Sequence, residues 1–311
     1  MASRSLVLHA DDFGMNAAIN SGILRSFRDG LLTSTSLLAN APNAAEACNH
    51  WPTLIADLHA GSLPSSGLRQ RVGDDLSRFD LGIHLNLTQG RPLTSTYPSE
   101  LLNQQGQFPG IGPVFRQLRA VGSRFREGVR QELSTQIQFM LDHQLAPTHL
   151  NGHQYVELIP GVAELVPELI QKFSIPVIRV AREINLFQTV LFKGRVPAFA
   201  LSLIKRYYAE RFRRSPAIAA LAAPARFFGT AHAGVIDRGI LRRFLKCASP
   251  VGCTEIGLHP AVEPDGNSIP PEWNDPLATA RPAELDWLCD AATGELITTY
   301  GLRLGRLWQV P

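Results

Sequence analysis

The chain has few cysteines and pairs none of them in a recognisable motif. Four cysteines stand at positions 48, 247, 253 and 289, and no two of them form a Cys-x-x-Cys unit. Such wide spacing indicates neither a zinc knuckle nor a disulfide framework. We therefore expect free thiols that pack as small apolar side chains, in a protein of the reducing cytoplasm.

Long apolar runs and a strong imbalance of charge are also missing. No stretch approaches the roughly 18 uninterrupted apolar residues of a membrane-spanning helix, and the run before Asp11 is too short for a signal peptide. The net charge is only +3 at pH 7. That value is too small to argue for a nucleic-acid partner.

Short apolar stretches alternate with helical patterns along the 311 residues. Asn16 can cap a helix that runs through Asp29, and Gly30 follows as its stop. After the first strand we expect others at 33–39, 81–88, 148–150, 177–180 and 254–258, and an irregular loop at about 57–77. Most intervals between strands are long enough for crossover helices, which predicts a parallel sheet or barrel. The composition, 45% hydrophobic and 18% charged, allows a full core, and we expect one domain over 1–311.

Two adjacent carboxylates end the first apolar stretch. The run Leu6-Val7-Leu8-His9-Ala10 leads to Asp11 and Asp12, and the strand breaks at Gly14. A buried strand that ends in this way places both acids where α/β enzymes carry out chemistry. A solvated turn is the simpler explanation for an isolated Asp-Asp pair.

Four histidines also stand where predicted strands run into loops. They are His84, His149, His153 and His259. A lone histidine on an apolar strand is usually a core residue whose ring nitrogens find backbone partners. Parallel topology, however, brings every carboxyl end to one side of the sheet, so the histidines and the Asp pair converge. One carboxylate and two imidazoles can hold a divalent metal ion and leave positions open for water and substrate.

Five motifs follow one another along the chain. They are Asp11-Asp12-Phe13-Gly14, the segment Gly-Ile-His-Leu-Asn-Leu-Thr around His84 that continues to Leu93, Pro147-Thr148-His149-Leu150-Asn151-Gly152-His153, Ile178-Arg179, and Leu258-His259-Pro260-Ala261. In this order the chain resembles the YdjC-like carbohydrate deacetylases from residue 5 to about residue 305. That family includes chitooligosaccharide deacetylases and the hopanoid-associated HpnK proteins.

The resemblance implies an α/β fold, an irregular (β/α) barrel of the polysaccharide-deacetylase type with its active site at the carboxyl ends of the strands. It implies one divalent metal ion held by Asp12, His84 and His153, with magnesium as the usual ion and Asp11 as the base. From the ligand set alone, two imidazoles favour zinc or another transition metal, so both assignments stay open. The implied reaction is metal-dependent removal of an N-acetyl group from an N-acetylated amino sugar.

Four further residues receive roles around this centre. His259 is our candidate for the acid that protonates the departing amine, and a core histidine is the equal alternative. His149 aligns with a family histidine that is not the usual ligand, so we assign it, together with Asn151, to substrate binding or to support of the ligands. Arg179 can orient Asp11, bind substrate oxygens or pair with a buried carboxylate.

The chain departs from the family pattern on the substrate side. Asn151 and Gly152, then Tyr155 and Glu157, stand where many members have an Asp-Ser pair and two more histidines. This change argues against a chitooligosaccharide substrate, and leaves the choice between a free oligosaccharide, a nucleotide sugar and a glycolipid open. Two other functions remain as alternatives: a non-catalytic barrel that binds carbohydrate or metal, and a metal-dependent phosphoesterase, which would ordinarily need more carboxylates.

A basic and apolar segment interrupts the alternation at about 187–234. Between Phe187 and Arg226, eight basic residues stand against the single acid Glu210, among large apolar and aromatic side chains. This pattern predicts peripheral contact with the anionic inner face of a membrane, and a lid or an oligomer contact is the alternative. Pro197 and Pro216 confine any helix to the stretch between them.

Overall fold

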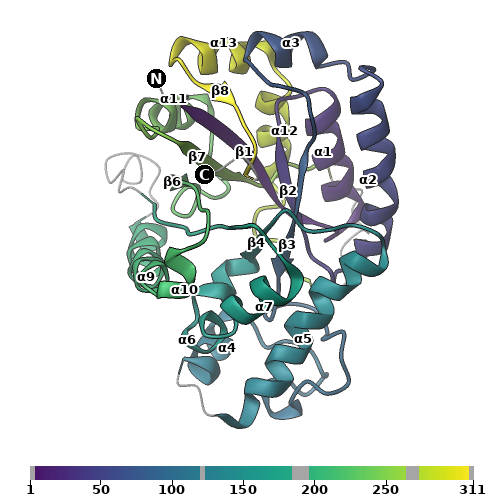
Figure 1. The fold of residues 1–311 in the computed structure, drawn as a ribbon, viewed down its shortest axis with the longest axis vertical. Helices are drawn as coiled ribbons and strands as arrows, with labels where there is room; N and C mark the ends of the chain where they lie inside the picture. The colour runs from purple at the N-terminus through teal and green to yellow at the C-terminus, as the bar shows by residue number, and fades with distance from the viewer. Residues whose placement is uncertain (1–3, 120–122, 184–195, 264–272, 308–311) are drawn as a thin grey trace.

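Parallel strands form one curled sheet at the centre of the molecule (Figure 1). The computed structural model describes residues 4–119, 123–183, 196–263 and 273–307. Within these ranges the sheet has eight strands in the order β5-β4-β3-β2-β1-β7-β6, with β8 paired to β1. The strands are β1 (Ser5–Phe13), β2 (Ser34–Leu37), β3 (Asp80–Leu85), β4 (His149–Gly152), β5 (Val177–Ile178), β6 (Arg226–Phe228), β7 (Cys253–Leu258) and β8 (Arg303–Leu304).

The two edges of the sheet approach each other, which curls the sheet towards a barrel. Val177 of β5 forms a parallel bridge with Ala222, and Glu183 forms another with Phe227 of β6. The Ile178 amide also donates to the Ala222 carbonyl at 3.0 Å. The chain is therefore an α/β protein built as an irregular parallel barrel, which confirms the predicted fold class.

Helices cover the outside of the sheet on opposite sides, with α1 and α2 on one and α9, α10 and α11 on the other (Figure 1). The helices are α1 (Ala17–Arg28), α2 (Ala44–His59), α3 (Ser66–Arg71), α4 (Ile111–Leu118), α5 (Ser123–Asp142), α6 (Pro160–Ala163), α7 (Val166–Phe173), α9 (Val196–Arg213), α10 (Pro216–Ala219), α11 (Arg238–Lys246), α12 (Arg281–Leu288) and α13 (Ala291–Thr299), with 3₁₀ turns η1 (Ser99–Leu101) and η2 (His153–Leu158). Because both faces of a covered parallel sheet are buried, its strands consist of nearly continuous apolar residues. In β1, every residue after Ser5 is buried.

The first strand-helix unit forms as the sequence predicts. Asn16 Oδ1 accepts a hydrogen bond from the Ile19 amide at 2.8 Å and so caps α1. Gly14 turns the chain out of β1 with φ of +98°, and a Cβ atom at this position would lie 3.1 Å from Ala44 Cα. The turn that follows the two acids therefore requires a glycine.

Two segments differ from the expectation. The stretch at 57–77, predicted as an irregular loop, contains the end of α2 and the whole of α3. The segment at 187–234 contains β6, which pairs with β7 in the central sheet. Elements of three to six residues are too short to show a period in the sequence. The helix expected between Pro197 and Pro216 is present as α9.

No helix within the described ranges combines the length and the apolar character of a membrane span. Helix α5 has 20 residues and α9 has 18, which approaches the length needed to cross a bilayer. Charged side chains interrupt both helices.

Candidate active site

Both acids of the first strand reach one cavity because the backbone twists at Asp12. Neighbouring side chains of a regular strand point to opposite faces of the sheet. Here the register of β1 against β2 shifts between Ala10 and Phe13, and Asp12 has a φ of +71°. Residues held in such left-handed backbone cluster at functional sites. As a result, Asp11 and Asp12 line the same cavity.

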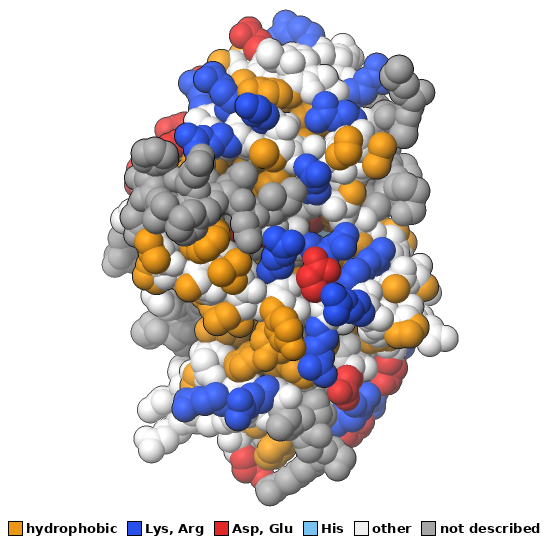
Figure 2. All heavy atoms as spheres, turned by 90° about the vertical axis from the view of Figure 1, so that its left-hand side faces the viewer, with side chains coloured by type: hydrophobic (Ala, Val, Ile, Leu, Met, Phe, Trp, Pro, Cys, Tyr) orange, Lys and Arg blue, Asp and Glu red, His pale blue; other side chains and the backbone are white. Residues whose placement is uncertain are grey.

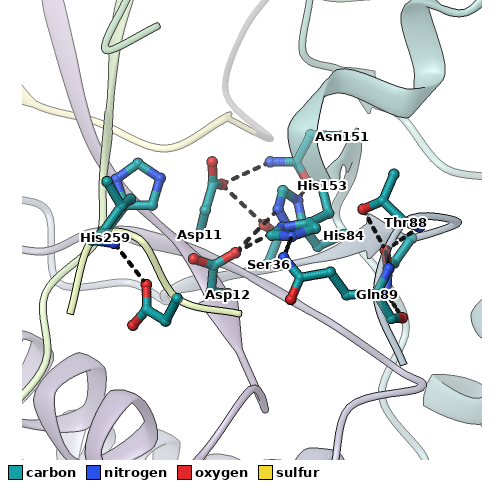
Figure 3. Close-up of polar contacts among 12 residues, drawn as sticks. Asp11, Asp12, Ser36, His84, Thr88, Gln89, Asn151, His153 and His259 are labelled. Atoms are coloured by element: carbon teal, nitrogen blue, oxygen red, sulfur yellow. Dashed lines mark hydrogen bonds and ion pairs between the residues drawn. The ribbon is translucent and has the colours of Figure 1, made fainter. Parts of the chain in front are cut away.

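Three potential metal ligands converge at this bend (Figure 3). Asp12 Oδ1 lies 3.0 Å from His153 Nδ1 and 3.6 Å from His84 Nε2. One ligand atom from each of the three residues lies within 4.8 Å of the others, and all three side chains are buried. The ends of β1 and β3 and the start of η2 thus bring together the residues that the resemblance assigns to the metal.

Asn151 links these potential ligands to Asp11 (Figure 3). It pairs with His84 in the register of β3 and β4. Its Nδ2 donates to Asp11 Oδ1 at 3.0 Å, so its Oδ1, 2.8 Å from His84 Nδ1, accepts a hydrogen bond from that ring nitrogen. His84 Nε2 is then the nitrogen with a lone pair, and it faces Asp12. Asn151 is buried outside the cavity lining, a placement that favours support of the ligands over contact with substrate.

Arg179 holds the other side of Asp11. Its Nη1 donates to Asp11 Oδ2 at 2.8 Å, and its Nε donates to Glu255 Oε1 at 2.7 Å. Burial acts to raise the pKa of Asp11, but the charge of Arg179, together with His84 and a hydrogen bond with His9, lowers the pKa well below its usual value. Since Arg179 is buried and does not line the cavity, its placement favours orientation of Asp11 over binding of substrate oxygens.

The sequence analysis missed His9 and Glu255, which belong to this network. His9 Nε2 lies 3.1 Å from Asp11 Oδ1, and His9 Nδ1 lies 2.9 Å from Ser34 Oγ. Burial lowers the pKa of His9 to about 3, so the ring is neutral at pH 7. The sequence contained a signal for both residues, because side chains two or four positions apart in a strand lie on the same face. His9 therefore shares a face with Asp11, and Glu255 shares one with His259.

Arg281 holds the second oxygen of Asp12. Its Nη2 donates to Asp12 Oδ2 at 2.7 Å, and its Nε donates to Asp275 Oδ2 at 2.7 Å. Burial acts to raise the pKa of Asp12, but Arg281 and a hydrogen bond with His153 lower it well below its usual value. No motif in the sequence marks Arg281, which begins α12.

His259 follows β7 directly and lines the same cavity. Its backbone amide donates to Glu284 Oε2 at 2.6 Å (Figure 3). Among the described residues, its Nδ1 has no hydrogen-bond partner although it is buried. Burial lowers the pKa of His259 to about 4, so the ring is neutral at pH 7.

His149 lies behind the cavity and does not line it. The ring is fully buried and contacts His9 edge-on, with ring centres 4.9 Å apart. A Cβ atom at Gly82 would lie 2.3 Å from His149 Nε2, so the ring packs directly on a glycine of β3. This position favours support of the site over contact with substrate.

The cavity at the carboxyl ends of the strands has a volume of about 220 Å³. Besides Asp11, Asp12, His84, His153, His259 and Arg281 it is lined by Met15, Gln89, Gly152, Gln154, Tyr155, Lys205, Thr230, Ala233, Asn274, Asp275, Pro276 and Leu277. The Tyr155 hydroxyl forms a hydrogen bond with Thr230 Oγ1 at 3.0 Å, and Lys205 Nζ lies 4.2 Å from the centre of the Tyr155 ring. Glu157, by contrast, is fully buried outside the lining, so of these two departures only Tyr155 reaches the substrate side.

An apolar groove of about 290 Å³ adjoins the cavity. Cavity and groove share Gln154, Tyr155 and Lys205. The rest of the groove is formed by Ile111, Gly112, Phe115, Leu158, Ile159, Leu201, Ile204 and Tyr208, from α4, η2, α9 and the residue after η2. The site therefore has a polar compartment and an apolar one side by side.

This arrangement of motifs has known relatives. The family model described as YdjC-like protein matches residues 5–299. The chain belongs to this family. A carbohydrate deacetylase of Geobacillus stearothermophilus is 33% identical to this YdjC-like chain over 181 residues, which cover 58% of the chain and 62% of the relative. A carbohydrate deacetylase of Mus musculus is 32% identical over 202 residues, which cover 64% of the chain and 57% of the relative.

The chain thus spans about three fifths of the length of these curated relatives. Among solved structures, a protein of Enterococcus faecalis provisionally named for cellobiose-phosphate cleavage superimposes with a TM-score of 0.72 and 20% identity. That superposition covers 98% of each chain. At this identity the likeness establishes a shared fold.

Proposed function

We propose that this chain is a metal-dependent hydrolase that removes the N-acetyl group from an N-acetylated amino sugar. The observation that carries the proposal is the convergence of Asp12, His84 and His153 beside the ionised Asp11 in one cavity. Membership of the YdjC-like family and the names of the curated relatives support the same reaction.

The three residues suit a divalent metal ion. A carboxylate and two imidazoles are a common donor set, and Asn151 leaves His84 Nε2 as the nitrogen that faces Asp12. A divalent ion bound there would lower the pKa of a water molecule and polarise the acetyl carbonyl. The imidazoles favour zinc or another transition metal, and the family resemblance retains magnesium as a second candidate.

Asp11 is the proposed base. Asn151 and Arg179 each hold one of its oxygens, and Arg179 is the largest of the contributions that keep the carboxylate ionised at neutral pH. An ionised carboxylate that lines the cavity can accept the proton of the attacking water.

His259 is the proposed acid for the departing amine, which must be protonated because an amide anion is too basic to leave. A ring that is neutral at pH 7 has to take up a proton during the reaction before it can donate one. His259 lines the cavity, and this position supports a transfer to an amine that leaves from there.

Acetate release from N-acetylglucosamine compounds tests the proposal. We expect turnover that stops when metal is removed and returns when zinc or magnesium is added. His84→Ala and His153→Ala should lose bound metal and activity while the fold is retained. His59→Ala, on the exposed end of α2, is the matched control and should keep both. Full metal occupancy in both site variants would refute the metal assignment, and sugar binding without acetate release would favour a binding barrel.

The apolar groove favours a glycolipid as the form of the substrate. Because the groove joins the cavity through Gln154, Tyr155 and Lys205, a group in the groove can be attached to a sugar in the cavity. Each methylene buried there should raise kcat/KM about fourfold. Alkyl glycosides of N-acetylglucosamine should therefore exceed its oligomers as substrates. Leu201→Ser should reduce this preference, and Leu203→Ser, outside the groove, should not.

A further inference from the structure

Helix α9 presents an unusual number of apolar side chains to solvent. Of the eight large apolar side chains that are exposed in the described ranges, five lie on this helix. They are Val196, Leu201, Leu203, Ile204 and Tyr207, which are between 41% and 62% exposed. Exposed apolar side chains that gather on one element mark an interaction site more often than scattered single residues do.

Three arginines stand among these apolar side chains. Arg206, Arg211 and Arg214 surround a shallow hollow on the outward face of α9 together with Leu203 and Tyr207. The one acid there, Glu210, lies 4.0 Å from Arg182 of the neighbouring segment. Figure 2 shows apolar and basic side chains side by side on this side of the molecule.

The other basic residues of the segment that the structure describes do not belong to this face. Lys205 lines the catalytic cavity. Arg213 donates to the carbonyls of Ile218 and Leu221, and Arg226 donates to the carbonyls of Cys247 and Ala248. Lys193 and Arg195 lie outside the described residues. Within the described part of the segment, the positive charge available to a partner is therefore concentrated on three positions, Arg206, Arg211 and Arg214.

We propose that the α9 surface, formed by Leu203, Ile204, Arg206, Tyr207, Arg211 and Arg214, binds the face of an anionic lipid bilayer. The apolar side chains would enter the boundary between headgroups and acyl chains, while the arginines meet the anionic headgroups. One arginine near such a surface contributes about fivefold to binding, so the three together contribute about 10²-fold.

The apolar groove supports a bilayer as the occupant of this surface. Leu201 and Ile204 belong both to the exposed cluster and to the groove lining. A bilayer against α9 would therefore lie at the mouth of an apolar path that leads to the catalytic cavity. The inference goes beyond the proposed function, because binding to lipid can be measured without turnover.

Co-sedimentation with vesicles tests this proposal. One set of vesicles contains phosphatidylcholine alone, and the other contains equal parts of phosphatidylcholine and phosphatidylglycerol. We expect the native protein to bind the anionic set, less tightly as salt rises. The triple variant Arg206→Glu, Arg211→Glu, Arg214→Glu should bind at least about 10²-fold more weakly. Leu203→Ser with Tyr207→Ser should also weaken binding, with the charge unchanged.

A charge-matched control separates a specific surface from overall charge. Arg25→Glu, Arg28→Glu and Arg71→Glu change the net charge equally on α1 and α3, and this variant should bind like the native protein. Circular dichroism verifies that all variants are folded. Equal binding by the native protein and the α9 triple variant would overturn the proposal, as would absence of binding by both. A native dimer that the α9 substitutions dissociate, without vesicle binding, would overturn it in favour of self-association.

Discussion

Glu157 offers a test of how the site is built, because it is a carboxyl group buried close to the proposed metal ligand His153. It stands in η2, four residues after His153, and is 0% exposed. Neither of its oxygens forms a hydrogen bond to another described residue. Burial raises the pKa of Glu157 from its ordinary value of 4.5 to about 7. The change to test is Glu157→Gln, which keeps the shape of the side chain and removes the titrating proton.

The raised pKa fixes the sign of a stability effect. The folded protein binds the Glu157 proton more tightly than the unfolded chain, so stability is lost as the pH rises from 4.5 through about 7. A shift from 4.5 to about 7, at about 1.4 kcal/mol per pH unit, corresponds to about 3 kcal/mol in the free energy of unfolding. Glu157→Gln should therefore be more stable than the native protein at pH 8, and the difference between the two proteins should shrink towards pH 5.

Urea unfolding of both proteins at pH 5 and pH 8 measures this difference. Burial also raises the pKa of Glu284 to about 7, but that contribution is common to both proteins and cancels in the comparison. Glu295→Gln, on the exposed side of α13, is the control and should follow the native protein at both pH values. If Glu157→Gln and the native protein lost stability in parallel between pH 5 and pH 8, the reasoning from burial would be wrong.

The remaining predictions concern the catalytic groups. Asp11→Asn should keep bound metal and lose turnover by about 10²–10⁴-fold, the usual size of a general-base contribution, whereas Asp12→Asn should lose the metal as well. Metal analysis beside acetate release distinguishes them, and the opposite pattern would exchange the two roles. His259→Ala should lower kcat by a similar factor with full metal content. Because burial holds its pKa at about 4, any limb of the pH–rate profile that belongs to His259 should lie near pH 4, and an unchanged kcat would make it a core residue.

The residues that carry the site were largely predictable because their signals are local. Asp11, Asp12, His84, His153 and His259 stand at strand ends, and parallel topology alone brings strand ends together. The α1 cap at Asn16 followed from the same kind of local reasoning. In each case a few adjacent residues were enough to make the prediction.

The residues that orient the site were less predictable because their partners are distant in sequence. Arg281 forms a hydrogen bond with Asp12, which lies 269 positions earlier in the sequence, and no residue pattern in the first turn of α12 predicts this contact. Asn151 was assigned without a choice between substrate and support, and only the two hydrogen bonds to Asp11 and His84 favour support. The three residues of β6 gave no period, and their place in the sheet depends on pairing with β7.

The left-handed backbone at Asp12 restricts how this site can evolve. Only glycine, and to a lesser degree asparagine and aspartate, accept that conformation readily, and of these only aspartate offers a carboxylate. Position 12 is therefore constrained twice, by geometry and by chemistry. Asp11 is not in the left-handed conformation and carries only the chemical constraint. If the proposed roles are correct, a single substitution at position 11 would remove the base and leave the metal ligands and the backbone geometry in place, which is a short route from an enzyme to a sugar-binding protein.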